Sequence, residues 1–277
     1  MSFELFWRRV HTNLSARYDQ TVTFKAQILF DLLTVVLQVA MWYFMARIVD
    51  SSTLGYPVNY IAFIFVGSLA AFLVTEAGSS LSGSFSRDMS AGLMKLAYIS
   101  NMDITEYFLI NFFTNIVFSL FLYIIPLIIT FMIVSHYSGD AAVFYLGPWN
   151  IFTLVMAVLV FIIGNLGITL MSMGSTLYLK EGDPVSFTVE QLNNFFSGQL
   201  FPLSILPKYL LFIPQILPTA YIILIWRDTL FLDKTLINSE LFSLSMVSLV
   251  INIVVFAIGY YMFYRGVRRA KLEGRWM

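Results

Sequence analysis

A short apolar stretch, residues 185–201, contains four polar side chains within five positions. They are Glu190, Gln191, Asn193 and Asn194. Neighbouring residues of a helix point in different directions, so these side chains cover more than one helix face. Amide and carboxyl groups are costly in contact with lipid. We therefore expect this stretch to face another helix or a substrate route, most simply at the centre of a dimer.

Two further ionisable residues interrupt apolar stretches. Asp31 and Glu76 join Glu190 as functional candidates, because charged groups inside membrane-like segments are expensive. Each could contact a substrate or carry a proton. Each could equally form an interhelical hydrogen bond or be hydrated from the nearby interface. The sequence leaves both interpretations open.

Several kinds of catalysis lack their motifs. No Gly-Lys pair occurs, so the GxxxxGK[ST] phosphate-binding loop is absent. The sequence has no cysteine, and its only histidines are His11 and His136. Neither the HExxH motif of zinc proteases nor the GxSxG motif of serine hydrolases is present. We therefore expect no catalytic residues, no resident cofactor and no metal site, and a membrane enzyme is disfavoured.

The composition is that of an integral membrane protein. Apolar residues make up 59% of the 277 residues and charged residues 12%, and the mean hydropathy is +0.81. Soluble proteins are about 25% charged. The formal net charge is zero, which gives no indication of nucleic-acid binding. The lipid bilayer is the expected partner.

The hydropathy pattern predicts an all-α membrane protein with six transmembrane helices in one domain, residues 1–277. The predicted spans are 26–46, 58–81, 107–134, 149–173, 185–201 and 241–264. Residues 1–20 have apolar positions at helical spacing, which predicts an amphipathic helix in the membrane interface. Residues 86–106 form the longest predicted cytoplasmic connection, with room for a short helix.

Half of the eight prolines lie in the apolar segment that follows the fifth span. They are Pro202, Pro207, Pro214 and Pro218. Proline lacks a backbone donor and breaks helices. We therefore expect residues 202–240 to be a re-entrant segment of broken helices on the outer side, packed on protein or lining a wet cavity. It could gate a transport route or serve only as a structural cap.

The distribution of lysine and arginine predicts the orientation. With six crossings and a cytoplasmic N-terminus, twelve of the 16 Lys and Arg residues lie in the cytoplasm. The four on the outer side are Arg47, Lys208, Arg227 and Lys234. A seventh crossing would move the basic C-terminal end outside. Both termini are therefore predicted to be cytoplasmic.

The C-terminal half resembles the permeases of ABC-2-type transporters. The resemblance rests on an ordered set of motifs: Phe195-Phe196-Ser197-Gly198, Phe201-Pro202-Leu203, Leu206-Pro207, Leu217-Pro218-Thr219-Ala220-Tyr221 and Trp226-Arg227. A weaker likeness is the cytoplasmic loop that begins at Arg87. There, Leu93-Met94-Lys95 stands where many members have Thr-Leu-Glu.

The resemblance implies a permease subunit in the cell (inner) membrane that moves a substrate by alternating access, with export as the expected direction. Two copies of a separate ATP-binding subunit, which hold ATP and Mg, and a second permease subunit, identical or homologous, are the implied partners. The substrate stays open, and an ion- or proton-coupled secondary transporter or channel is the alternative.

The resemblance also implies roles for particular residues. The implied contacts with the ATPase subunit are Arg87, Asp88, Met89, Gly92, Lys95 and Tyr98. The implied lining of the translocation route is Glu76, Gln191, Asn194, Phe195 and Gly198. The implied outer gate consists of Pro202, Pro207, Pro214 and Pro218.

Overall fold

The computed structural model describes residues 3–23, 25–49, 51–90, 104–138, 143–179 and 184–272. Within these ranges all regular elements are helices. The long ones are α1 (Phe3–Thr23), α2 (Lys25–Ala46), α3 (Tyr60–Ser90), α5 (Ile104–Ser119), α6 (Ile125–Ser138), α7 (Pro148–Leu179), α8 (Pro184–Phe196), α10 (Pro218–Leu232) and α11 (Ser239–Leu272). The short ones are η1 (Ser51–Leu54), the π-helix η2 (Leu120–Ile124), η3 (Leu203–Ile205), η4 (Lys208–Leu210) and α9 (Phe212–Ile216).

Four helices in the described ranges are long and apolar enough to cross a membrane. Their qualifying parts are Ile28–Ala46, Ile110–His136, Pro148–Leu179 and Ser239–Ala270. A fifth is added if the helices Lys208–Ile216 and Pro218–Leu232, which meet at 93°, count as one broken span. The helix α3 has 31 residues but is not among them, because its described apolar part is the shorter stretch Tyr60–Phe72; the predicted span 58–81 therefore stays a prediction. The chain is therefore a multi-pass membrane protein by helix length and hydropathy.

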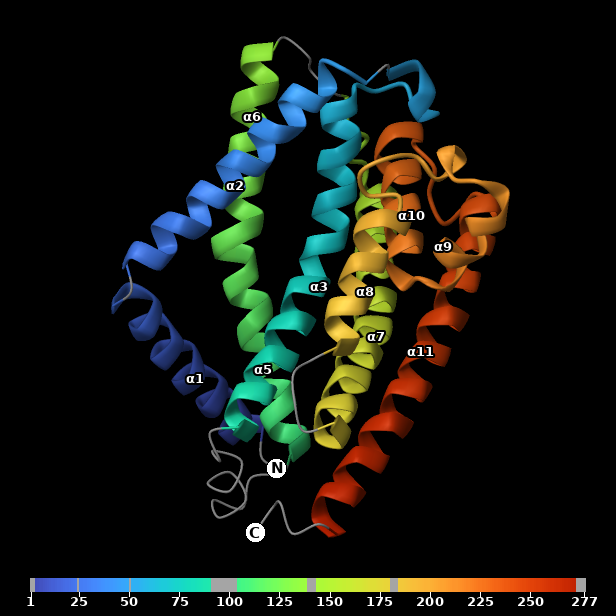
Figure 1. The fold of residues 1–277 in the computed structure, drawn as a ribbon. Coiled ribbons are helices and arrows are strands. Elements are labelled where there is room, and N and C mark those ends of the chain that lie inside the picture. Colours follow the sequence, from blue (N-terminus) through green and yellow to red (C-terminus); the bar gives the residue numbers. More distant parts are fainter. Residues whose placement is uncertain are drawn as a thin grey trace.

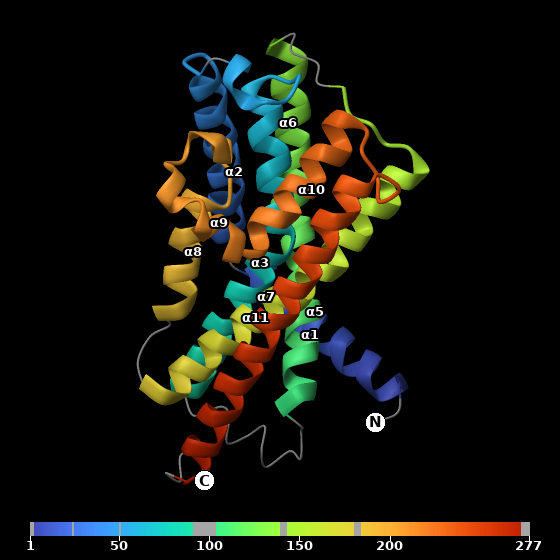
Figure 2. The same cartoon turned by 90° about the vertical axis from the view of Figure 1, so that its right-hand side faces the viewer.

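The long helices lie side by side in a bundle (Figure 1). The N-terminal helix α1 and the C-terminal end of α11 lie toward the same end of the bundle in both views (Figures 1 and 2). We call the opposite end of the bundle, where α3 begins, the upper end. The helix α1 is joined to α2 at a sharp bend and packs on α5, where Asn13 donates to Asn111 over 3.4 Å.

Glycines allow α7 and α11 to pack backbone against backbone. A Cβ atom added at Gly167 would lie 2.6 Å from the Cα of Phe256, and one at Gly174 would lie 2.8 Å from the carbonyl carbon of Met262. On the other helix, Gly259 faces Gly167 and Gly266 faces Gly174. Small residues at such spacing are typical of close helix pairs in membranes. This pair forms one side of the bundle and supports the site.

The predicted fifth span is shorter than expected. We predicted a helix over 185–201, whereas α8 ends at Phe196, because the backbone turns at Gly198 with a φ of +81°. Thirteen helical residues are about 20 Å long, too short for a hydrocarbon core of about 30 Å. The helix α8 lies near the middle of the bundle, and α10 extends toward its upper end (Figure 1). The two are half-helices separated by the segment 197–217.

The four prolines of this segment all lie at helix beginnings, where a missing N–H is tolerated. Pro202 and Pro207 precede the short helices η3 and η4. Pro214 lies in the first turn of α9, and Pro218 is the first residue of α10. The prolines therefore divide the segment into short helices, as expected. The expectation of short helices alone was incomplete, since α10 has 15 residues and is buried among α3, α7 and α11.

Candidate functional site

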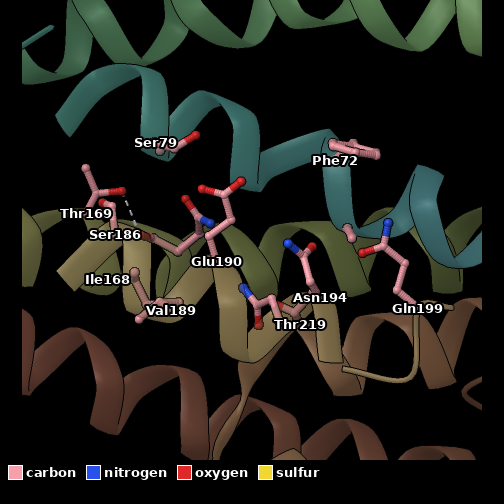
Figure 3. A pocket seen from close by; sticks show the side chains of 14 residues that line it. Phe72, Ser79, Ile168, Thr169, Ser186, Val189, Glu190, Asn194, Gln199 and Thr219 are labelled. Carbon is pink, nitrogen blue, oxygen red and sulfur yellow. Dashed lines mark hydrogen bonds between the residues drawn. The ribbon is translucent and has the colours of Figure 1, made fainter. Parts of the chain in front are cut away.

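A polar pocket lies where the two half-helices α8 and α10 approach each other between α3 and α7. Its volume is about 90 Å³. On α8, Ser186, Glu190, Asn193 and Asn194 line it, and their spacing of three and four residues places them on one helix face. Figure 3 shows Glu190 and Asn194 extending from α8 toward the space beside α3. The polar residues of the predicted fifth span thus do gather at a pocket.

The rear of the pocket is formed by α7 and α3. Asn165 and Thr169 lie one turn apart on α7, and the Thr169 hydroxyl donates to the Asn165 carbonyl over 2.9 Å. Gly78 of α3 faces both side chains, and a Cβ atom at Gly78 would overlap them. The absence of a side chain at Gly78 therefore lets α3 and α7 approach each other while keeping the two polar groups between them.

Three buried oxygen atoms of the pocket residues have no hydrogen-bond partner among the described residues. They are Oδ1 of Asn165, Oδ1 of Asn193 and Oγ1 of Thr219. Their residues are 4%, 9% and 0% exposed. An unpartnered buried polar atom costs about 1–3 kcal/mol. Three such atoms at one pocket are the arrangement expected of a site that receives a polar molecule.

The size of the pocket limits what it can hold as it stands. A water molecule occupies about 30 Å³, so about three fit. Pockets for drug-sized ligands measure about 300–1,000 Å³. Ser79, Glu190 and Asn194 are exposed, whereas Asn193 and Thr219 are buried. The pocket therefore opens between α3 and α8, and a larger solute would have to extend beyond it or widen it.

Above the pocket, α3 is bonded to the chain that follows α8. The Tyr60 hydroxyl donates to the Leu200 carbonyl over 2.9 Å. The amide of Gln199 donates from Nε2 to the Ser68 hydroxyl over 3.0 Å. These bonds hold residues 199–200 along the upper part of α3, next to the residues that line the pocket.

Arg227 of α10 is buried in the same place. Its guanidinium donates to three backbone carbonyls: from Nη1 to Gly198 over 2.7 Å, from Nη2 to Gln199 over 3.0 Å, and from Nη2 and Nε to Phe63 over 2.9 and 3.3 Å. The side chain is 2% exposed, and its Cζ lies 3.4 Å from the centroid of the Phe63 ring. Arg227 thereby connects α3, α10 and the end of α8.

Two features of the surroundings make this burial feasible. The carbonyls of Gly198 and Gln199 lie just beyond the C-terminus of α8, where the helix dipole favours a cation. Gly67 supplies the space, because a Cβ atom there would collide with Nη2 of Arg227. No carboxylate among the described residues is paired with Arg227, so its charge is balanced by carbonyl dipoles and an aromatic ring.

A second polar cluster lies near the upper end. The Tyr56 hydroxyl donates to Asp228 over 2.8 Å, and Lys234 lies 3.6 Å from Asp228 and 3.0 Å from Glu240. Burial, together with the Asp228 carboxylate, raises the pKa of Tyr56. The hydrogen bond to Glu240, together with the charge of Asp228, raises the pKa of Lys234. This cluster joins the end of α10 to the beginning of α11.

The predicted route residues are placed differently from one another. Asn194 lines the pocket, whereas Gln191 and Phe195 are exposed and do not. Gly198 lies at the turn after α8, and a Cβ atom there would meet Leu203 at 3.1 Å. Glu76 lies within α3, but its side chain is outside the described part.

The predicted ATPase contacts lie at or beyond the lower end of α3. Arg87, Asp88 and Met89 belong to the last turns of α3, which continues to Ser90, and their side chains are not among those described. Gly92, Lys95, Tyr98 and the predicted loop helix lie outside the described residues. In the described part of the chain, no group of three or more Asp, Glu or His residues is arranged to hold a metal.

Sequence reasoning missed several residues of the site. Asn165 and Thr169 are four residues apart in an otherwise apolar stretch, and this spacing was a signal for a polar helix face. Arg227 was counted on the outer side and named in the Trp226-Arg227 motif, but its burial and its bonds to α3 were not predicted. Its signal was its position inside the apolar run 218–232. If Arg227 is left out of the count, twelve basic residues predicted on the cytoplasmic side face three predicted on the outer side.

No protein-family model matches the sequence, and no curated protein matches it.

Proposed function

We propose that the chain is the membrane-spanning permease subunit of an ATP-driven transporter of the ABC-2 type, and that it works as an exporter. One observation carries the proposal: the residues of the sequence motifs form the turn after α8, begin α10 and connect α10 to α3, next to the pocket. Pro202 and Pro207 precede the two short helices, Pro218 starts α10, and Arg227 connects α10 to α3. Of the motif residues, Thr219 lines the pocket itself. Motif residues that shape one region of the fold support a functional resemblance.

The pocket fits such a role. Broken helices that end at a polar site inside the membrane recur in transporters. The upper end of the bundle would be the outer side, and both chain termini would be cytoplasmic. The exposed polar face of α8, with Gln191 and Asn194, would be covered by a second permease subunit or by water in the route.

Energy would come from a separate subunit. The chain has no GxxxxGK[ST] sequence, so two copies of an ATP-binding partner would hydrolyse ATP. The helix α3 is continuous from the pocket to Ser90, and it would carry motion from the predicted contacts at Arg87 and Asp88 to the site.

The test is co-purification from native membranes in a mild detergent. A tagged chain is expected to bring down an ATPase that contains GxxxxGK[ST], identified by mass spectrometry, whereas an unrelated tagged membrane protein is not. Transport in vesicles should require ATP and should survive dissipation of the proton gradient. Absence of any ATPase, together with transport that stops when the gradient is dissipated, would overturn the proposal in favour of a secondary transporter.

A further inference from the structure

We propose that Arg227 and its carbonyl partners form the outer gate of the polar pocket, an inference that rests on the proposed transport function. We call the contact between α3 and residues 198–200 the outer seal. It comprises the bonds from Tyr60 to Leu200, from Gln199 to Ser68, and from Arg227 to Phe63, Gly198 and Gln199. Gating is thereby assigned to a buried cation, whereas the sequence had suggested the four prolines.

The order of contacts along α3 supports this assignment. From its upper end, α3 first presents Tyr60 and Phe63 to the outer seal, then Gly67 and Ser68, and only then the pocket residues from Ala71 to Ser79. At 1.5 Å per residue, Phe63 lies about 12 Å above Ala71. The outer seal therefore stands between the pocket and the upper end of the bundle.

The outer seal and the pocket share residues. Gln199 lines the pocket with its side chain, while its carbonyl accepts from Arg227 and its amide group donates to Ser68. Thr219 lines the pocket from the first turn of α10, the helix that carries Arg227. Movement of the segment 198–200 away from α3 would therefore expose the pocket from above.

The chemistry of Arg227 suits a contact that opens and closes. A buried guanidinium loses its hydration, and here no carboxylate among the described residues compensates for that loss. Hydration of the cation on opening would offset the loss of its bonds to the carbonyls. A salt bridge would hold the closed form more strongly, whereas carbonyls leave the closed and open forms closer in free energy.

A substitution at Gly67 tests the proposal without changing Arg227 itself. Alanine at this position would place a Cβ atom in collision with Nη2 of Arg227, and would displace the guanidinium without changing it. Gly83 lies on the same helix, and a Cβ atom there would meet nothing within 4 Å. Gly83→Ala is therefore a matched control for Gly67→Ala.

The experiment measures access to the pocket from the outer side. The chain contains no cysteine, so Thr219→Cys creates a single thiol at the pocket. A small membrane-impermeant methanethiosulfonate is applied to intact cells, and the labelling rate is compared with that of Lys208→Cys, which lies on an exposed short helix. Thr219→Cys is expected to react slowly while the outer seal is closed.

Weakening the outer seal should increase this rate. A charge-assisted hydrogen bond contributes about 1.5–3 kcal/mol, so losing one should raise the open population, and with it the labelling rate, about tenfold or more. We expect this rise for Thr219→Cys combined with Arg227→Lys or with Gly67→Ala, and none with Gly83→Ala. Tyr60→Phe removes one neutral bond and should give a smaller rise in a well-folded protein.

The possible outcomes test the gate proposal separately from the proposed transport function. An unchanged labelling rate in Arg227→Lys, Gly67→Ala and Tyr60→Phe would overturn the gate. If Arg227→Lys or Gly67→Ala does not elute as a monodisperse species, the labelling rate of the Tyr60→Phe variant alone decides whether the gate proposal stands. Labelling requires neither ATP nor a partner, so a positive result would stand even if no ATPase co-purified. Conversely, a co-purifying ATPase with unchanged labelling would leave the proposed function intact and reject the gate.

Discussion

Some buried polar residues of the pocket lower the stability of the fold, as residues kept for function often do. Asn193 of α8 is buried, and its Oδ1 has no partner among the described residues. A side chain selected only for stability would be apolar here, because leucine has a similar volume and leaves no polar atom unpartnered. Residues that sacrifice stability in this way are typical of functional sites.

We therefore expect Asn193→Leu to stabilise the protein while impairing transport. Removal of the unpartnered amide should raise the free energy of unfolding by about 1–3 kcal/mol. Gln191→Leu, at an exposed position of the same helix, should change stability by no more than about 0.5 kcal/mol. Thermal melting in detergent measures both variants, and a destabilised Asn193→Leu would show that the amide has a structural role.

The cluster around Asp228 should make the free energy of unfolding decrease as the solution becomes alkaline. The pKa of Tyr56 is raised above its ordinary 10.0 and that of Lys234 above its ordinary 10.5. For a raised pKa, the stabilisation is complete below the ordinary value and is lost as the pH rises through the raised one. Both residues therefore stabilise the fold at neutral pH, and both contributions decline in strongly alkaline solution.

The expected result for Tyr56→Phe is a lower melting temperature at pH 8 and a smaller decline between about pH 10 and 12 than in the unsubstituted protein. The difference between the two melting curves isolates Tyr56 from the other titrating groups. Tyr209→Phe, at a position 75% exposed, serves as the control and should follow the unsubstituted protein. A parallel decline in Tyr56→Phe would contradict the pKa shift.

At the scale of elements, the pair α7 and α11 depends on its glycines. Gly167 approaches the backbone of Phe256 so closely that one methyl group has no space. Overpacking of this kind costs about 1–3 kcal/mol. Gly167→Ala should therefore lower the melting temperature in detergent, whereas Gly83→Ala, which meets nothing within 4 Å, should not. Equal stability of the two variants would show that the close contact does not form.

The sequence predicted the long helices well and the broken crossing only in outline. The helix α2 spans Lys25–Ala46, against a predicted span of 26–46, because a continuous apolar run specifies a membrane helix by itself. The helix α11 continues to Leu272, beyond the predicted end at 264, since a helix can extend past the bilayer without apolar residues. The apolar runs that specify these long helices are local in the sequence.

The site was harder to predict because its contacts are distant in the sequence. Phe63 and Arg227 are 164 positions apart, and no local pattern shows that a carbonyl would receive the guanidinium. The α8 residues were found, because four polar side chains in an apolar run are a local anomaly. Their partners on α7 and α10 appear only in the fold.

At the scale of the whole molecule, the proposals depend on an even number of crossings. The beginning of α1 and the end of α11 lie toward one end of the bundle (Figure 1). The helix α8 begins near the middle of the bundle, and α10 extends toward its upper end (Figure 1). The predicted six crossings would leave both termini on the side predicted to hold twelve basic residues, as the positive-inside rule requires.

The absence of cysteine allows this topology to be tested one position at a time. Lys208 and Leu272 are both exposed. Lys208 belongs to the segment between α8 and α10, in the upper half of the bundle, and Leu272 is the last residue of α11, which ends at the lower end (Figure 1). We expect Lys208→Cys to react with a membrane-impermeant maleimide on intact cells, and Leu272→Cys to react only after the membrane is permeabilised. Lys234 is a poorer probe in its native form, because its amine donates to Glu240 and lies 3.6 Å from Asp228. Reaction of Leu272→Cys on intact cells, without reaction of Lys208→Cys, would reverse the orientation. The predicted ATPase contacts would then lie outside the cell, where no ATP is supplied, and an ATP-driven mechanism would be untenable.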